Sequence, residues 1–150
     1  MTDLTGLQTF KFGDSDALAD RLAALVVAGV KTGTCSAAVH GPDTKVGEQQ
    51  VCLNSSGTPV CIIETVSMEL KPFTAVTKEE AALEGEGDLS FEYWRDAHIS
   101  YYKREGTWAD DMEVYFETFK LVEILDADFA AKADWHVAED RAGRTIGAAG

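Results

Sequence analysis

Basic side chains are scarce in this chain of 150 residues. Lysine and arginine number 13 against 26 aspartates and glutamates, so the formal net charge at pH 7 is −13. Binding to nucleic acids depends largely on neutralising phosphates with cationic side chains. The charge balance therefore disfavours a long RNA or DNA ligand, although a local basic patch would still hold a short strand.

Long hydrophobic runs are also missing. No stretch approaches the roughly 18 consecutive apolar residues that a membrane-spanning helix needs. The polar start, Met1 to Gln8, lacks the basic segment and apolar run of a secretory signal. We therefore expect a cytoplasmic protein with no membrane partner.

Motifs for metals and nucleotide cofactors are absent. The chain has no HxxxH, HxH or CxxC pattern, and its three cysteines, Cys35, Cys52 and Cys61, are not at zinc-ligand spacing. There is no GxGxxG or P-loop pattern either. We expect buried thiols in a reducing compartment, no catalytic metal and no cofactor.

Size and composition favour one globular domain. Hydrophobic residues make up 45% of the chain and charged residues 26%, which is an ordinary balance for such proteins. We divide the chain into a folded domain, residues 1–125, and a C-terminal extension, residues 126–150. The extension ends in Ala and Gly, a composition typical of a partly disordered segment. The oligomeric state is left open.

Three helices are predicted from local signals. Apolar residues recur at helical spacing over residues 14–28, and Gly29 supplies a stop. A capping box begins at Thr77 and predicts a short helix that runs toward Glu84. Residues 89–105 place aromatic side chains on one helical face and end before a glycine.

Strands are predicted between and after these helices. Residues 35–39, 50–53 and 60–66 have the composition and turn spacing of an antiparallel meander. Residues 112–125 are rich in Val, Phe, Tyr and Ile, which favours a long closing strand. Short strands interrupted by helices indicate a small α+β barrel.

Three segments carry a resemblance to a known family. Residues 10–14 read FKFGD, residues 28–34 read AGVKTGT, and residues 84–98 begin EGEGD and continue through FEYWRDAH. Together they resemble the ASCH domain family over roughly residues 9–125. The resemblance implies an α+β fold of PUA-like type, a small mixed β-barrel with about three surrounding helices and a cleft.

The resemblance also implies a function. A compact bacterial branch of the family, similar to N(4)-acetylcytidine amidohydrolases, carries a Lys, a Thr three residues later and a Glu that ends the capping-box helix. Lys31, Thr34 and Glu84 match these positions. This chain is longer and has a helix around Trp94 to His98 that the branch lacks. The departure concerns the choice of substrate more than the chemistry.

The leading hypothesis is therefore an amidohydrolase that acts on N(4)-acylated cytidine or cytosine, or on a related small nucleoside amide. Two alternatives remain: a ribonuclease specific for single strands, and a non-catalytic module that binds RNA or modified nucleosides. Both alternatives require basic residues gathered around the cleft. The preferred acyl group, and whether the substrate is a free nucleoside or RNA, stay open.

Hydrolysis of an amide assigns roles to the three residues. Thr34 is the candidate nucleophile, Lys31 a candidate general base, and Glu84 a group that orients Lys31 or grips the substrate. Lysine acts as a base only if its pKa falls well below about 10.4, whereas a nearby carboxylate favours the ammonium. Which of Lys31 and Glu84 is the base is therefore open.

Four further residues are candidates for substrate binding. The backbone N–H groups of Gly33 and Thr34 would form a donor pair for the oxyanion. Glu64 lies among apolar strand residues, where a structural partner is favoured over a site role. Trp94 and His98 share a helical face, and aromatic residues at that spacing belong to a core more often than to a stacking platform.

Overall fold

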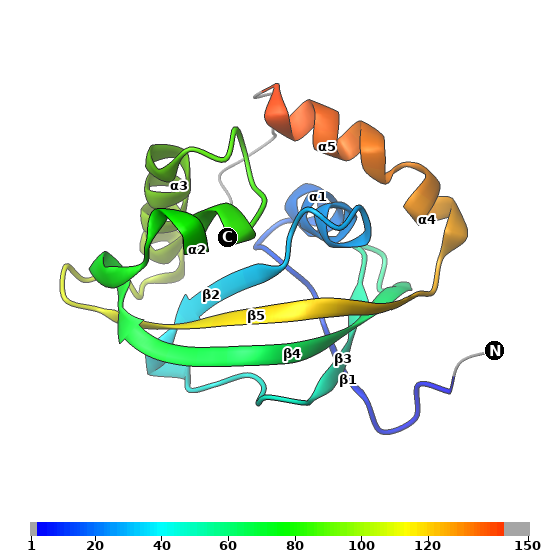
Figure 1. Cartoon of the computed structure of the whole chain (residues 1–150), viewed down its shortest axis with the longest axis horizontal. Coiled ribbons are helices and arrows are strands. Elements are labelled where there is room, and N and C mark those ends of the chain that lie inside the picture. The colour runs from blue at the N-terminus through cyan, green and yellow to red at the C-terminus, as the bar shows by residue number, and fades with distance from the viewer. Residues whose placement is uncertain (1–2, 143–150) are drawn as a thin grey trace.

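One mixed sheet organises residues 3–142, the part of the chain that the computed structural model describes. Its strands, in chain order, are β1 (Gln8–Phe10), β2 (Gly33–Ala37), β3 (Gln49–Leu53), β4 (Pro59–Pro72) and β5 (Glu113–Ile124). The sheet curls into a half-barrel with helices above it (Figure 1). The predicted α+β fold of PUA-like type is confirmed.

The order of the strands differs from a simple meander. The order across the sheet is β1-β3-β4-β5-β2, with β3, β4 and β5 joined antiparallel and β1 pairing parallel with β3. β2 pairs with β5 and not with its neighbour in sequence, β3. The predicted meander is therefore wrong at β2, and β1 was missed because three residues are too few to show alternation.

The three predicted helices are present. They are α1 (Asp16–Val27), α2 (Lys78–Leu83) and α3 (Phe91–Glu105). Ser15 caps α1, and the predicted capping box between Thr77 and Glu80 is complete. Two further helices, α4 (Ala127–Ala131) and α5 (Ala133–Arg141), follow the sheet. None of the helices within residues 3–142 combines the length and the apolarity needed to cross a membrane.

Two apolar clusters hold the helices on the sheet. The first surrounds α1, whose Leu22 and Leu25 are at most 1% exposed because the sheet lies below the helix and α5 above it (Figure 1). The second lies between α3 and strands β2 and β5, around Trp94, Tyr102 and Phe116. Each such large side chain stabilises the fold by about 2 kcal/mol. The two clusters fix α1 and α3 over different parts of one sheet.

The C-terminal extension packs on the domain as far as the structure describes it. Arg141 of α5 donates from Nη1 to the carbonyl oxygens of Gly85 (2.8 Å) and Gly87 (2.9 Å). Asp140 accepts a hydrogen bond from the Gly87 amide at 2.7 Å and lies 3.4 Å from buried Arg21 of α1. Helix α5 thus ties α1 to the loop after α2, while residues 143–150 of the extension lie outside the described part.

The loop after α2 approaches the chain after α1 very closely. Gly85 has a φ of +69°, and a Cβ added there would lie 2.2 Å from the carbonyl oxygen of Val30. Only glycine combines this backbone conformation with this approach. The glycine therefore sets the distance between Glu84 to Glu86 and the segment that holds Lys31.

We expect Gly85→Ala to lower the free energy of unfolding by about 3 kcal/mol or more, measured by urea denaturation. The left-handed φ alone costs about 1–2 kcal/mol, and the overlap with the backbone at Val30 adds to it. Gly57→Ala is the matched control, because Gly57 has a φ of +82° and no atom within 4 Å of the added Cβ. Equal losses in the two variants would contradict the close approach.

Candidate functional site

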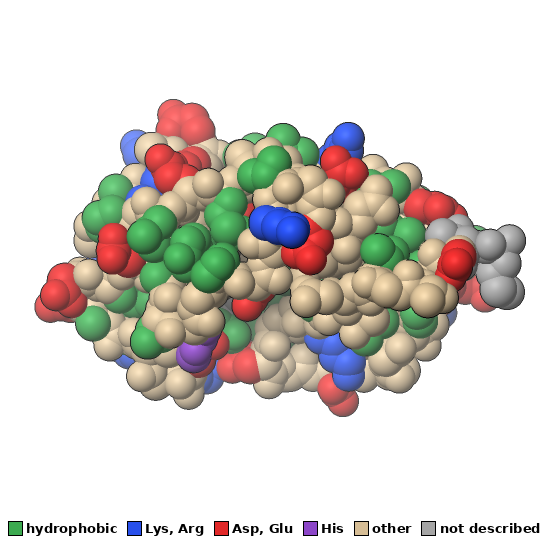
Figure 2. Space-filling model, turned by 90° about the horizontal axis from the view of Figure 1, so that it is seen from below, with side chains coloured by type: hydrophobic (Ala, Val, Ile, Leu, Met, Phe, Trp, Pro, Cys, Tyr) green, Lys and Arg blue, Asp and Glu red, His purple; other side chains and the backbone are tan. Residues whose placement is uncertain are grey.

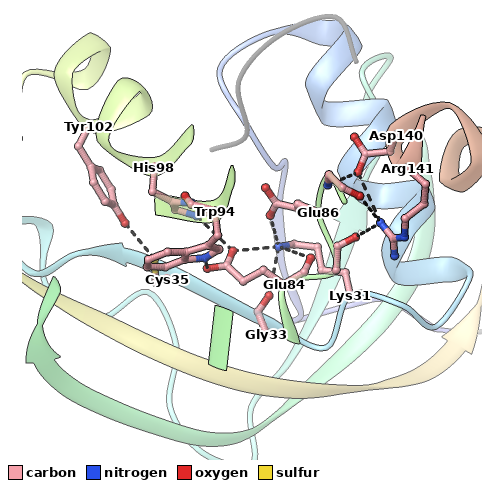
Figure 3. A network of polar contacts seen from close by, with 12 residues as sticks. Lys31, Gly33, Cys35, Glu84, Glu86, Trp94, His98, Tyr102, Asp140 and Arg141 are labelled. Carbon is pink, nitrogen blue, oxygen red and sulfur yellow. Dashed lines mark hydrogen bonds and ion pairs between the residues drawn. The ribbon is translucent and has the colours of Figure 1, made fainter. Parts of the chain in front are cut away.

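A buried lysine is the centre of the polar network. Lys31 lies between α1 and β2, and it is 1% exposed. Its Nζ donates to Glu86 Oε2 at 2.7 Å, to Glu84 Oε1 at 3.2 Å and to the Gly33 carbonyl at 3.1 Å (Figure 3). The structure thus brings Lys31 and Glu84 together, as the resemblance implied.

The second oxygen of Glu84 connects this network to α3. Trp94 Nε1 donates to Glu84 Oε2 at 2.7 Å, and His98 Nε2 lies 3.3 Å from Glu84 Oε1 (Figure 3). His98 Nδ1 lies 2.8 Å from the Trp94 carbonyl, which orients the ring. Glu84 therefore joins the segment before β2 to the helix that covers β2.

The charges of the network set its protonation. Burial alone lowers the pKa of Lys31, but the carboxylates of Glu86 and Glu84 outweigh it and raise that pKa above its usual value. Burial raises the pKa of Glu84, yet His98 and Lys31 bring it well below its usual range. Neither group has the pKa near neutrality that suits a general base. Both are held in their charged forms.

Thr34 lies apart from this pair. In β2 the side chains of Cys35 and Ala37 are on the buried face toward α3, while Thr34 is half-buried on the alternate face. Within the described chain, the Thr34 hydroxyl has no hydrogen-bond partner and no bond to Lys31 or Glu84. The turn that would let Lys31 and Thr34 cooperate is a strand instead.

The backbone of Thr34 is committed to the sheet. Phe119 donates to the Thr32 carbonyl at 2.9 Å, and the register pairs Thr34 with Glu117. Hydrogen-bonded pairs recur at every second residue of an antiparallel ladder, so the Thr34 amide points at Glu117. Adjacent amides in a strand point in opposite directions, so this geometry gives no support to the expected oxyanion donor pair of Gly33 and Thr34.

Thr34 lines a pocket of about 790 Å³. The pocket is lined by β1 and the residues that follow it, by residues 34–37 of β2, by one residue each of β3, β4 and β5, and by the second half of α3. Its lining residues are Gln8, Thr9, Phe10, Lys11, Phe12, Gly13, Thr34, Cys35, Ser36, Ala37, His40, Pro42, Asp43, Gln50, Ile63, Tyr101, Tyr102, Glu105 and Glu117. Aromatic and polar side chains are both present, as in most small-molecule sites.

Glu117 is the functional candidate that sequence reasoning missed. It lies in β5 directly opposite Thr34, and Thr65 Oγ1 donates to its Oε2 at 3.2 Å. Burial raises the pKa of Glu117 to about 7, with the Thr65 hydrogen bond opposing the shift and the charge of Asp43 adding to it. Only the pairing of β2 with β5 reveals this acid, and no local signal predicts that pairing.

The four predicted substrate-binding residues do not line the pocket. Gly33 accepts the Lys31 hydrogen bond through its carbonyl. Glu64 accepts from Gln49 at 3.1 Å and faces Lys120 at 3.6 Å. Trp94 and His98 stack with ring centroids 4.5 Å apart in the core. These contacts fit structural roles, while binding roles for the four residues remain untested.

One cluster within residues 3–142 has ligand atoms close enough for a metal. The candidate atoms of Cys35, Glu84 and His98 lie within 4.8 Å of one another, and all three residues are buried. A Cys, His and Glu set suits zinc. However, the Glu84 oxygen nearest His98 also accepts a bond from the Lys31 ammonium, which would face the ion. The ion pairs of Glu84 account for the cluster, so we derive no metal chemistry from it.

Comparison with known proteins identifies a family. The sequence profile described as the ASCH domain matches residues 8–123. The crystal structure of an ASCH domain from Lactobacillus crispatus JV V101 superposes with a TM-score of 0.72 at 33% identity, over 78% of this chain and 80% of that chain. A crystal structure from Enterococcus faecalis V583 gives 0.71 at 28% identity, over 82% and 84%. No curated protein matches the chain.

We expect Lys31→Met to lower the free energy of unfolding by about 3–5 kcal/mol, because it leaves two buried carboxylates without their cation. Lys120→Met is the matched control. Lys120 is 62% exposed at its side chain and lies 3.6 Å from Glu64, so its loss should cost less than about 1 kcal/mol. Similar losses by urea denaturation would show that the Lys31 pair is not a structural requirement.

We expect Glu117→Gln to change how stability depends on pH. The folded-state pKa of Glu117 lies above the usual 4.5, at about 7, so the wild type loses stability as pH rises from about 4.5 through 7. The variant lacks this loss. Its free energy of unfolding should equal that of the wild type near pH 4 and exceed it by about 1–3 kcal/mol near pH 8. A constant difference across this range would contradict the raised pKa.

Proposed function

The chain belongs to the ASCH domain family, which is RNA-related, and from this premise we propose that it hydrolyses the exocyclic amide of N(4)-acylated cytidine or a related small nucleoside. The observation that carries the proposal is the unpartnered hydroxyl of Thr34 in a pocket lined by the described residues. A free hydroxyl beside the half-buried carboxylate of Glu117 suits covalent amide hydrolysis, which needs a nucleophile with a base next to it.

The size and lining of the pocket support a nucleoside. Its volume of about 790 Å³ falls in the range of small-molecule sites, roughly 300–1,000 Å³. Tyr101 and Phe10 offer aromatic faces for a base. Gln8 and Gln50, whose side chains are joined at 3.4 Å, offer both donors and acceptors to its polar edge. This size and lining favour a single nucleoside over a polymer in the proposal.

Lys31 and Glu84 support Thr34 by position. The Lys31 ammonium holds the Gly33 carbonyl at 3.1 Å, one residue before the nucleophile. Glu84 fixes that ammonium from the end of α2, and both side chains are at most 1% exposed. In this proposal they hold the start of β2 and supply a fixed positive charge, and neither accepts the proton of Thr34.

The basic residues give little support to binding of an RNA strand. Lys71 pairs with Glu80 at 2.7 Å, and Arg104 pairs with Asp14 at 2.8 Å. Lys31 is enclosed in its own network. Lysine and arginine side chains lie apart from one another on the face that Figure 2 shows, with acidic side chains among them. A strand would meet repulsion where it needs phosphate contacts.

We expect the purified protein to release cytidine from N(4)-acetylcytidine in the presence of a chelator. Thr34→Ala should lower kcat/KM by about 10³-fold or more because it removes the nucleophile. Thr34→Ser keeps a hydroxyl at the same position and should retain measurable turnover. Thr74→Ala is the control, since Thr74 is exposed in the segment Phe73–Ala75 away from the pocket.

Two outcomes would overturn this function. Turnover that survives Thr34→Ala would place the chemistry elsewhere. A folded wild type that leaves acetyl, propionyl and butyryl cytidines intact, but cleaves or binds short single-stranded RNA, would favour a ribonuclease or an RNA-binding module. Chromatography of nucleosides and a labelled RNA oligomer separate these results.

A further inference from the structure

Amide hydrolysis at Thr34 leaves one proton without an acceptor. The Thr34 hydroxyl must lose its proton as it attacks, and the leaving amine must gain one. Lys31 already carries its proton, and Glu84 is held as a carboxylate by the groups around it. The acceptor therefore has to be a different side chain that reaches Thr34 from within the pocket.

We infer that Glu117 accepts the proton of Thr34 and returns it to the leaving amine. This inference rests on the proposed function, in which Thr34 is the nucleophile. It rests as well on three geometric observations: the register of β2 and β5, the shared pocket, and the contact that holds one Glu117 oxygen.

The register puts the two side chains next to each other. Thr34 and Glu117 are direct partners across antiparallel strands, so their side chains leave the same face with Cβ atoms about 5 Å apart. Both line the pocket. A glutamate on this spacing reaches a neighbouring hydroxyl by rotation about its own side-chain bonds. No movement of the backbone is needed.

A chain of hydroxyls orients the carboxylate. Thr65 Oγ1 donates to Glu117 Oε2 at 3.2 Å and itself lies 3.1 Å from Thr44 Oγ1. Thr65 is 1% exposed, so the donor of this contact is held inside the fold. The other oxygen, Oε1, has no hydrogen-bond partner among the described residues and is left for Thr34 or for substrate.

The electrostatic surroundings suit a base that works near neutral pH. Asp43 from the β2–β3 connection and Glu84 from the end of α2 raise the pKa of Glu117, while Lys31 lowers it. Lys11, His40 and Glu105, together with Cys35, Tyr101 and Tyr102, are the other charged or titratable groups that line the pocket. Burial is the largest of these effects and raises the pKa of Glu117 to about 7. Such a value lets one group both take and return a proton.

Two other pocket groups do not suit this task. Burial raises the pKa of Tyr101 to about 12, and burial also raises the pKa of the Cys35 thiol. Both therefore keep their protons at neutral pH and cannot accept another. Cys35 is also engaged with the Tyr102 hydroxyl at 3.1 Å.

The two half-reactions balance through Glu117. Thr34 Oγ forms a bond to the acyl carbon while its proton passes to Glu117, and the C–N bond breaks as that proton moves to the amine. This step releases cytidine and leaves an ester on Thr34. Water then attacks the ester, Glu117 takes the water's proton and returns it to Thr34 Oγ, and a carboxylic acid leaves. No oxidant or other co-reactant is needed.

The test compares pH profiles of kcat/KM. The wild type should lose activity below about pH 7, as Glu117 becomes protonated. Glu117→Gln should lower kcat by about 10²–10⁴-fold, change KM by only a few-fold and abolish that acidic limb. Glu117→Asp should recover part of the rate. Glu113→Gln is the control, because Glu113 is exposed at the start of the same strand.

A second substrate separates this inference from the proposed function. p-Nitrophenyl acetate reports acylation of Thr34 through nitrophenol release and an acetylated Thr34 peptide. Acylation that depends on Glu117, without turnover of acylated cytidines, would remove the nucleoside assignment and keep the base. Wild-type rates and an unchanged acidic limb in Glu117→Gln would overturn the inference, and so would the failure of both substrates to acylate Thr34.

Discussion

The buried ammonium of Lys31 is the constraint on which the arrangement of the site depends. An ionised amine out of water is costly unless charges and hydrogen bonds surround it. Here the partners come from three places: the Gly33 carbonyl at the start of β2, Glu84 at the end of α2, and Glu86 in the loop that follows. Satisfying one cation therefore fixes three segments that are far apart in sequence. These contacts fix the start of β2 and therefore the position of Thr34.

The network of contacts around Lys31 extends to the end of the described chain. Trp94 binds Glu84 from α3, and Arg141 of α5 binds the carbonyls on both sides of Glu86. Gly85 permits the close approach to Val30 that brings both glutamates within reach of Lys31. Residues 126–142 thus hold the loop around Glu86 in place, although the composition of the C-terminal extension predicts partial disorder. A charge network of this kind is sensitive to any partner's loss, because each removal leaves a buried charge unpaired.

The helices could be predicted from local sequence signals. The pairing of the strands, and the site residues that depend on it, could not. Ser15, the Thr77 capping box and Gly106 mark helix ends through contacts within a few residues. The Lys31–Glu84 pair was expected from a family resemblance. The residue paired with Thr34 lies 83 positions further along the chain, and a shift of one residue in this register would turn Glu117 to the opposite face. The pKa of Lys31 could not be predicted from the sequence either, because it depends on two carboxylates that only the fold brings close to Lys31.

The two faces of β2 differ in how far their polar groups are paired. On the face of β2 toward α3, Lys31 and Glu84 are paired and held in their charged forms. On the other face, Thr34 lacks a partner, and Glu117 is kept in surroundings that oppose its ionisation. A chain shaped for stability alone gains from a neutral side chain at position 117, because a buried acid of raised pKa weakens the fold above neutral pH. Strained or unfavourable groups of this kind concentrate at functional sites. The unfavourable acid lies opposite the free hydroxyl, which is where amide hydrolysis needs a base.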